Sequence, residues 1–195
     1  AGAQTTLPAF NGRVSQVLRQ ADGGYLVAGL FTTVGSQSAK WLARLKPDLT
    51  LDTEFQAKLG TLNGSGGVGR VVELPDRRIA VAGGFTDLNG AAGTAGIVLL
   101  HRDGSRDTGF TSSASNNLTI YGLAYDATDS TLLVGGNGFL YAGASKLLHR
   151  IRLDGSRVGS FDVEIGGSGT LRSLMLQADR DILLGGSFTS VQGVD

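Results

Sequence analysis

The sequence predicts an all-β fold: a β-propeller-like array of four-stranded antiparallel blades, about three and a half repeats long. Two motifs recur along the chain, and 31 glycines stand against only 3 prolines in 195 residues. This glycine content is about twice the roughly 7% of ordinary proteins and suits a fold with many tight turns between short strands. The recurrence decides the fold class, because a fixed internal period is the signature of a repeat architecture.

The first motif is an apolar run that ends in glycine and phenylalanine. Its phenylalanines lie 54, 54 and 49 residues apart, and propeller blades repeat at about 40–50 residues. The third copy is the loosest, because Gly138 is inserted before Phe139. The four copies are residues 25–32, 79–86, 132–139 and 182–189.

The second motif is an apolar run followed by a polar turn and another phenylalanine. It covers residues 42–55, 97–110 and 148–161, which align without a gap. Each unit is therefore expected to contain four strands, of which the fourth ends on Phe55, Phe110 or Phe161. Consecutive apolar residues in these runs are typical of strands that are covered on both faces. No helix is expected, because no segment keeps a helical period free of glycine for ten residues.

Polar turn signals separate the expected strands. Asp103-Gly104 and Asp154-Gly155 predict two-residue hairpin turns between the third and fourth strands, because glycine accepts the positive φ of a primed turn. The predicted units cover residues 1–13 (the end of a preceding fourth strand, with Phe10), 14–67, 68–117, 118–170 and 171–195 (half a unit). A propeller needs about four to eight blades to close, so we expect a segment of a longer array with further repeats in the same polypeptide. A four-blade ring completed by the Phe10 segment is the alternative.

The motifs also resemble a known family. Gly83-Gly84-Phe85-Thr86, Leu42-Ala43-Arg44-Leu45 and Leu51-Asp52-Thr53-Glu54-Phe55 resemble the delta-60 repeat of large, mostly bacterial secreted or surface proteins. The resemblance covers nearly the whole chain and implies a propeller-like array. It implies no activity, because its motifs include no catalytic residues.

Charge and composition exclude several function classes. The chain has 17 basic and 17 acidic residues, so we expect no nucleic-acid partner. Cysteine is absent, which excludes disulfides and thiolate chemistry. Apolar runs stay short of the roughly 18 residues of a membrane-spanning helix, so no membrane insertion is expected.

The motifs that suggest chemistry all have structural explanations. Residues 64–69 match G-x-G-x-x-G, with Asp87 near the place of a ribose-binding acid, but a strand follows them instead of the helix that a dinucleotide site requires. His101 and His149 occupy different repeat positions, which favours two strand-surface residues over a paired site. No catalytic residue, metal or cofactor is therefore predicted, and an enzyme is not expected.

Calcium is the one metal considered. The aspartate pairs Asp126/Asp129 and Asp179/Asp181 flank equivalent turns, and loop carboxylates of this kind can bind calcium. Turn chemistry explains aspartate at such positions without an ion, so the turn interpretation is preferred.

The connections on the two ends of the blades differ, and this asymmetry carries the functional prediction. The turns between strands one and two and between strands three and four are tight, whereas the other connections are long and polar. We call the end with the long connections the long-loop face, and binding residues tend to lie on loops that a rigid scaffold holds. The candidate ligand-binding residues there are Thr32, Thr33, Asn63, Thr86, Asp87, Asn89 and Asn116.

The sequence thus predicts a recognition or adhesion module of a larger secreted or cell-surface protein. Its partner would be a protein or a carbohydrate, and its location extracellular or on the cell surface. The alternatives are a glycan-processing propeller enzyme and a purely structural repeat spacer.

Overall fold

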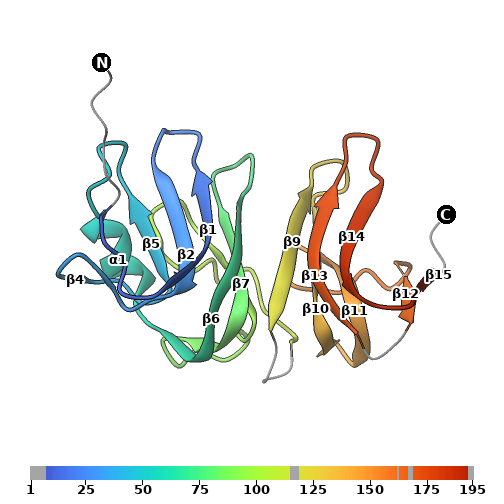
Figure 1. Cartoon of the computed structure of the whole chain (residues 1–195). Helices are drawn as coiled ribbons and strands as arrows, with labels where there is room; N and C mark the ends of the chain where they lie inside the picture. The colour runs from blue at the N-terminus through green and yellow to red at the C-terminus, as the bar shows by residue number, and fades with distance from the viewer. Residues whose placement is uncertain (1–7, 115–118, 162, 167–168, 193–195) are drawn as a thin grey trace, which may run out of the picture.

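The computed structural model describes residues 8–114, 119–161, 163–166 and 169–192, and within them strands dominate (Figure 1). Every strand pair in these ranges is antiparallel, which confirms the all-β prediction. The elements in chain order are β1 (Arg13–Arg19), β2 (Tyr25–Leu30), β3 (Thr33–Val34), β4 (Gln37–Ser38), β5 (Leu42–Leu45), α1 (Thr53–Leu59), β6 (Leu62–Glu73), β7 (Ile79–Leu88), β8 (Ile97–Leu100), β9 (Ile120–Asp126), β10 (Thr131–Tyr141), β11 (Ala144–Arg152), β12 (Glu164–Gly166), β13 (Thr170–Leu176), β14 (Ile182–Ser187) and β15 (Ser190–Gln192).

Eleven of the described strands form four consecutive sheets, which we call blades 1 to 4, and β3-β4 and β12-β15 form two further two-stranded sheets. The blades are β1-β2-β5, β6-β7-β8, β9-β10-β11 and β13-β14. The first strand of each blade is an edge of its sheet and lies against the first strand of the next blade, as Figure 1 shows for β9 and β13. These first strands therefore form the inner side of the array, and we call β1, β6, β9 and β13 the inner strands.

The fourth segment of each unit differs from the prediction. In place of a strand that ends on the second phenylalanine, each segment makes a single antiparallel bridge to the third strand: Leu45 to Leu51, Leu100 to Arg106, and Ile151 to Arg157. Among the described residues the sheets consequently contain at most three strands. In the first two units the segment turns away after the bridge because Asp52 caps a helix and Asp107 accepts from the Gly109 N–H in a turn.

Helix α1 is the clearest case of this turning away. Asp52 is its N-cap, and its side chain accepts a hydrogen bond of 3.1 Å from the Phe55 backbone N–H. Glu54 in the first turn and Lys58 in the last turn suit the helix dipole. Phe55 is buried on this helix and not on a strand, so the expectation of no helix was wrong here.

The tight turns share one geometry, and it is not the predicted two-residue hairpin. In the turn from His101 to Ser105, the Gly104 N–H donates to the His101 carbonyl (3.0 Å) and the His101 N–H to the Ser105 carbonyl (2.8 Å), which leaves three residues in the loop. The third residue of each turn is an aspartate that accepts from the N–H two residues later, and the fourth has positive φ. The six turns are residues 20–24, 46–50, 74–78, 101–105, 152–156 and 177–181.

A β-bulge recurs in every inner strand, opposite the glycine of the first motif. A Cβ on Gly83 would lie 2.2 Å from the Gly67 carbonyl oxygen of the paired strand. Equivalent clashes meet Gly29, Gly136 and Gly186. These four glycines therefore permit close pairing within one blade.

Apolar cores fill the spaces between successive blades. Leu26 and Leu42 of blade 1 pack with Val71, Val81 and Phe85 of blade 2. Corresponding clusters join blade 2 to blade 3 and blade 3 to blade 4. Stability thus resides in interfaces between neighbouring repeats, as in other repeat arrays.

The outer face of blade 4 lacks this cover, and that of blade 1 lacks it in part. Leu183 is 52% exposed, whereas the same repeat position is fully buried at Leu26, Ala80 and Leu133. At the other end Val14 is 39% exposed, whereas its equivalent Val68 is 1% exposed. Val27 and Leu45 on the same face of blade 1 are buried with Phe10 and Val34, so this face is uncovered only along β1.

Phe10 belongs to the approach to β1. It bridges to Val34, and in the next unit Leu62 pairs with Leu88 at the same place. The structure thus aligns Phe10 with Leu62 and not with the phenylalanines of the second motif. The unit boundaries given above stay a prediction.

Candidate functional site

The long-loop face lies at the lower end of the blades in Figure 1, opposite the tight turns. In blade 2 it brings three predicted residues together. Asn63 lies opposite Asp87 in the β6–β7 ladder, and its side-chain amide donates to the Asp87 carboxylate (2.6 Å). The Thr86 hydroxyl donates to the same carboxylate (3.1 Å), and so does the Gly90 backbone N–H (2.6 Å). Asp87 is thus held from three directions on a rigid hairpin.

These three donors also set the charge of Asp87. The hydrogen bond from Asn63 is the largest influence, and with those from Gly90 and Thr86 it lowers the pKa of the Asp87 carboxyl below its ordinary value of 3.8, against a smaller effect of burial. The carboxylate is therefore ionised at neutral pH and fixed in place. Thr86 beside it is exposed and available to a ligand.

Asn89 performs a different task. Its side-chain oxygen accepts from the Thr61 N–H (2.6 Å), and its amide nitrogen donates to the Leu59 carbonyl (3.3 Å) at the C-terminus of α1. It adopts a positive φ of 55°, which asparagine tolerates better than most residues. Asn89 therefore ties the β7 end to the end of α1, and most of its hydrogen-bonding capacity is internal.

The predicted residues of blade 1 form a second, separate group. The Asn11 side-chain oxygen accepts from the backbone N–H groups of Thr32 (2.8 Å) and Thr33 (2.9 Å), and its amide donates to the Thr32 hydroxyl (2.8 Å). Sequence reasoning missed Asn11, although Asn63 occupies the same repeat position one unit later. Asn116, the remaining candidate, lies outside the described residues.

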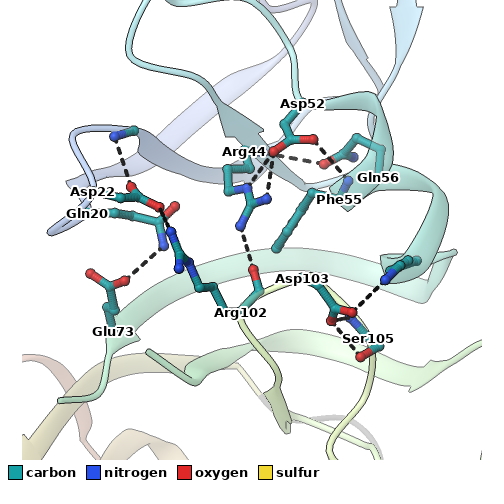
Figure 2. A network of polar contacts seen from close by, with 12 residues as sticks. Gln20, Asp22, Arg44, Asp52, Phe55, Gln56, Glu73, Arg102, Asp103 and Ser105 are labelled. Atoms are coloured by element: carbon teal, nitrogen blue, oxygen red, sulfur yellow. Dashed lines mark hydrogen bonds and ion pairs between the residues drawn. The ribbon is translucent and has the colours of Figure 1, made fainter. Parts of the chain in front are cut away.

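The opposite end of the blades, which we call the tight-turn face, is occupied by ion pairs (Figure 2). The Arg44 guanidinium donates to the Asp52 carboxylate at 2.6 and 2.8 Å and lies 4.6 Å from the Phe55 ring centroid. Arg102 of blade 2 reaches Asp22 of blade 1 at 3.1 Å. These contacts tie the turns of neighbouring blades together.

In the other blades one partner of the Arg44–Asp52 pair is replaced, and another residue pairs with the charge that remains. In blade 2 Leu99 takes the place of Arg44, and the Asp107 carboxylate is instead paired with Arg78 (2.9 Å). In blade 3 Val158 takes the place of Asp52, and Arg150 instead contacts Asp126 (2.7 Å). Each buried charge thus keeps a partner, as its desolvation requires.

Asp126 and Asp129 are the calcium candidates that the structure can describe in detail. Both contact Arg150, at 2.7 and 3.2 Å, and both also contact Arg180. Burial acts to raise the pKa of Asp126, but the hydrogen bonds from Arg150, Thr128 and Arg180 outweigh it and lower this pKa to about 2. Two guanidinium groups therefore occupy the place that a calcium ion would take. Within the described ranges, no group of three or more metal-ligating side chains is present.

A shallow hollow of about 440 Å³ opens on the inner strands near the tight-turn face. Sequence reasoning did not predict it, because its lining comes from three different blades. The lining residues are Ala21, Val72, Glu73, Leu74, Pro75, Arg77 and Tyr125.

Comparison with known proteins supports the repeat assignment. The family described as "Domain of unknown function (DUF5122) beta-propeller" matches residues 20–55 and 74–110. Both stretches run from the end of an inner strand to the second phenylalanine, so the match follows the repeat. In these two stretches the chain is similar to the DUF5122 β-propeller family. The DUF5122 match agrees with the resemblance to delta-60 repeats and carries no activity.

One solved structure supports the fold. The extracellular domain of BT4673 from B. thetaiotaomicron is similar to 98% of this chain at 18% identity, with a TM-score of 0.59. A second crystal structure of a BT4673 extracellular domain is similar at 14% identity with a TM-score of 0.43, and covers 98% of this chain and 33% of that one. The chain spans 23% of the first BT4673 structure. No protein with a curated description matches the chain. Across the part of the chain that the structure describes, no helix is long and apolar enough to cross a membrane.

Proposed function

We propose that this chain is a recognition or adhesion module of a larger secreted or cell-surface protein. It binds a protein or glycan ligand through the long-loop face, and the proposal assigns it no catalytic residue and no cofactor. The observation that carries the proposal is the carboxylate of Asp87, which Asn63, Thr86 and Gly90 fix in place beside an exposed hydroxyl. Pre-organised polar groups on rigid elements are what a selective binding site requires.

The fixed carboxylate suits hydroxyl-rich or amide-rich ligands. An ionised aspartate accepts hydrogen bonds through both oxygens, and the neighbouring threonine hydroxyl, which donates to Asp87, can accept from a ligand. Sugars and peptide backbones offer matching groups. The extracellular location of the BT4673 domains agrees with this role at the level of the fold.

The experiment compares two exposed sites on opposite faces of the chain. The double variant Thr86→Ala/Asp87→Ala should lose binding at least about tenfold on a glycan array or to surface-protein fragments, because charge-assisted hydrogen bonds to a ligand are lost. The control Lys46→Ala lies in an exposed tight turn and should bind as the parent chain does. Equal binding by both variants, or no retained ligand, would refute the proposal.

A structural spacer is the rival function, and one observation favours it. Asn11, Asn63 and Asn89 direct their side chains at hydrogen bonds within the chain and not at solvent. A spacer predicts that the double variant changes only thermal stability. Measuring ligand binding and melting temperature on the same samples separates the two functions.

A further inference from the structure

The β-bulge of the inner strands presents one extra residue per blade, and this residue differs between blades. It is Ser15, Gly69, Tyr121 or Arg172, at the same position of β1, β6, β9 and β13. Bulges re-aim a side chain out of the regular ladder and are frequent beside functional sites. In blades 3 and 4 the two large bulge residues meet, since the Arg172 guanidinium lies 6.0 Å from the Tyr121 ring centroid.

The inner strands also carry arginines without an acidic partner. Arg13, Arg19, Arg70 and Arg172 lie on them, and none forms a salt bridge within the described part of the chain. Three of the four are exposed, and Arg70 donates only to the Gly69 carbonyl oxygen (2.9 Å). Elsewhere Arg44, Arg78 and Arg150 all have carboxylate partners.

The acids of the same strands are already neutralised. Glu73 accepts from the Gln20 amide (3.2 Å) and the Ala21 N–H (3.0 Å), and Arg77 lies 3.7 Å away. Asp126 is paired with Arg150 at 2.7 Å. A chain with no net charge thus has a cationic inner surface, which composition alone conceals.

Aromatic surface accompanies this charge. Tyr121 and Tyr125 lie four residues apart on β9, both half-buried, and Tyr125 lines the hollow near the tight-turn face. Tyrosine combines an apolar ring face with a polar tip, so it can contact a sugar ring and its hydroxyls together. A guanidinium suits a planar carboxylate or a sulfate, which it can engage with two parallel hydrogen bonds.

We propose that the inner strands bind an anionic polysaccharide. Arg172 and Arg70 contact its carboxylate or sulfate groups, and Tyr121 packs against a sugar ring. The polymer runs along β9 and β13 towards the hollow beside Tyr125. This site is separate from the long-loop face and does not depend on the function proposed above.

A polysaccharide fits these residues better than a nucleic acid does. Nucleic-acid-binding domains carry a large excess of positive charge, whereas this chain has 17 basic and 17 acidic residues. Nucleic acid is therefore treated as an outcome that would contradict the proposal.

The test measures binding of the whole chain to polygalacturonate, dextran sulfate, neutral dextran and single-stranded DNA by affinity electrophoresis at about 50 mM NaCl. We expect retardation by polygalacturonate or dextran sulfate and none by neutral dextran. Raising the salt to about 500 mM should weaken binding several-fold, because the Debye length falls well below its roughly 10 Å at 0.1 M. Whether carboxylate or sulfate is preferred follows from comparing the two anionic polymers.

Variants locate the site. Arg172→Gln should weaken binding about tenfold, the typical effect of losing one charged hydrogen bond. Tyr121→Ala should weaken it about fivefold, whereas Tyr121→Phe should retain most affinity. The matched control is Arg152→Gln, an exposed arginine of β11 whose guanidinium donates to Ser156 and to the Arg157 carbonyl oxygen. Melting curves confirm that each variant is folded.

Four results would overturn the proposal. They are no binding to either anionic polymer, an equal loss in Arg152→Gln, single-stranded DNA bound at least as tightly through Arg172, and a loss in Thr86→Ala/Asp87→Ala. The last would move the anionic ligand to the long-loop face. Binding that survives in that double variant but falls in Arg172→Gln supports the inner-strand site, even if the long-loop proposal fails.

Discussion

Replacing Leu183 by alanine should cost far less stability than the same replacement at Leu133, although both residues occupy the same repeat position. Leu133 is fully buried between blades 3 and 4, so Leu133→Ala should cost about 2–5 kcal/mol through lost burial and the cavity left behind. Leu183 is 52% exposed, so Leu183→Ala should cost about 1 kcal/mol or less, with no cavity formed.

Urea unfolding followed by far-UV circular dichroism measures both costs on the whole chain. With a slope of about 2 kcal/mol per molar urea, the midpoint should fall by about 1–2.5 M for Leu133→Ala and by less than about 0.5 M for Leu183→Ala. Leu26→Ala, at the same repeat position in blade 1, should behave as Leu133→Ala does because Leu26 is also fully buried.

Equal costs at Leu183 and Leu133 would refute this reasoning. They would mean that the outer face of blade 4 is covered in solution by another repeat unit or by a second copy of the chain. Repeating the titration at a tenfold lower protein concentration distinguishes these, since only a second copy makes the midpoint depend on concentration.

Three further predictions test the scaffold. Asp126 has a folded-state pKa of about 2 against an ordinary value of 3.8, so its contribution of about 2 kcal/mol is complete above pH 3.8 and is lost as the pH falls to 2. The stability difference between the parent chain and Asp126→Asn should shrink over that range in urea titrations, and a constant difference would contradict the ion-pair explanation. Gly83→Ala should destabilise by about 3 kcal/mol because its Cβ would lie 2.2 Å from a carbonyl oxygen, whereas Gly90→Ala, with open space and a φ of 72°, should cost only about 1 kcal/mol in thermal melts. Asn89→Ala should cost about 1–2 kcal/mol and lower helicity, because it removes both bonds to the end of α1, and unchanged stability would show that those bonds are replaced by water.

The tight turns show what local sequence can and cannot predict. The aspartates predicted the positions of the turns correctly, since Asp22, Asp76 and Asp179 each accept from the N–H two residues later. The turn length was wrong, because Asp-Gly fits both a two-residue primed turn and a three-residue turn whose last residue has positive φ. Arg77 and Arg180 take that position without glycine, so only the hydrogen bonds of the folded hairpin reveal it.

The candidate site was likewise predicted only in part from the sequence. The sequence placed Asn63, Thr86 and Asp87 on one face, and they do meet around one carboxylate. It missed Asn11 and the inner-strand surface, because both depend on residues that are far apart in the chain. Arg172 and Tyr121 are adjacent only because successive blades bring their bulges to the same height.

The sequence by itself determined the all-β repeat architecture, the order of three strands in each unit and the position of the turns. These follow from local periodicity and composition, which recur in each repeat. Only the tertiary structure decided that the fourth segment forms a single bridge in place of a strand. It also decided the partners of the compensating ion pairs and the arrangement of the inner strands. The physical reason is that these features depend on burial and charge pairing between blades. A residue such as Leu183 has the same local sequence pattern as Leu133, and only the presence or absence of a neighbouring blade decides whether it is buried.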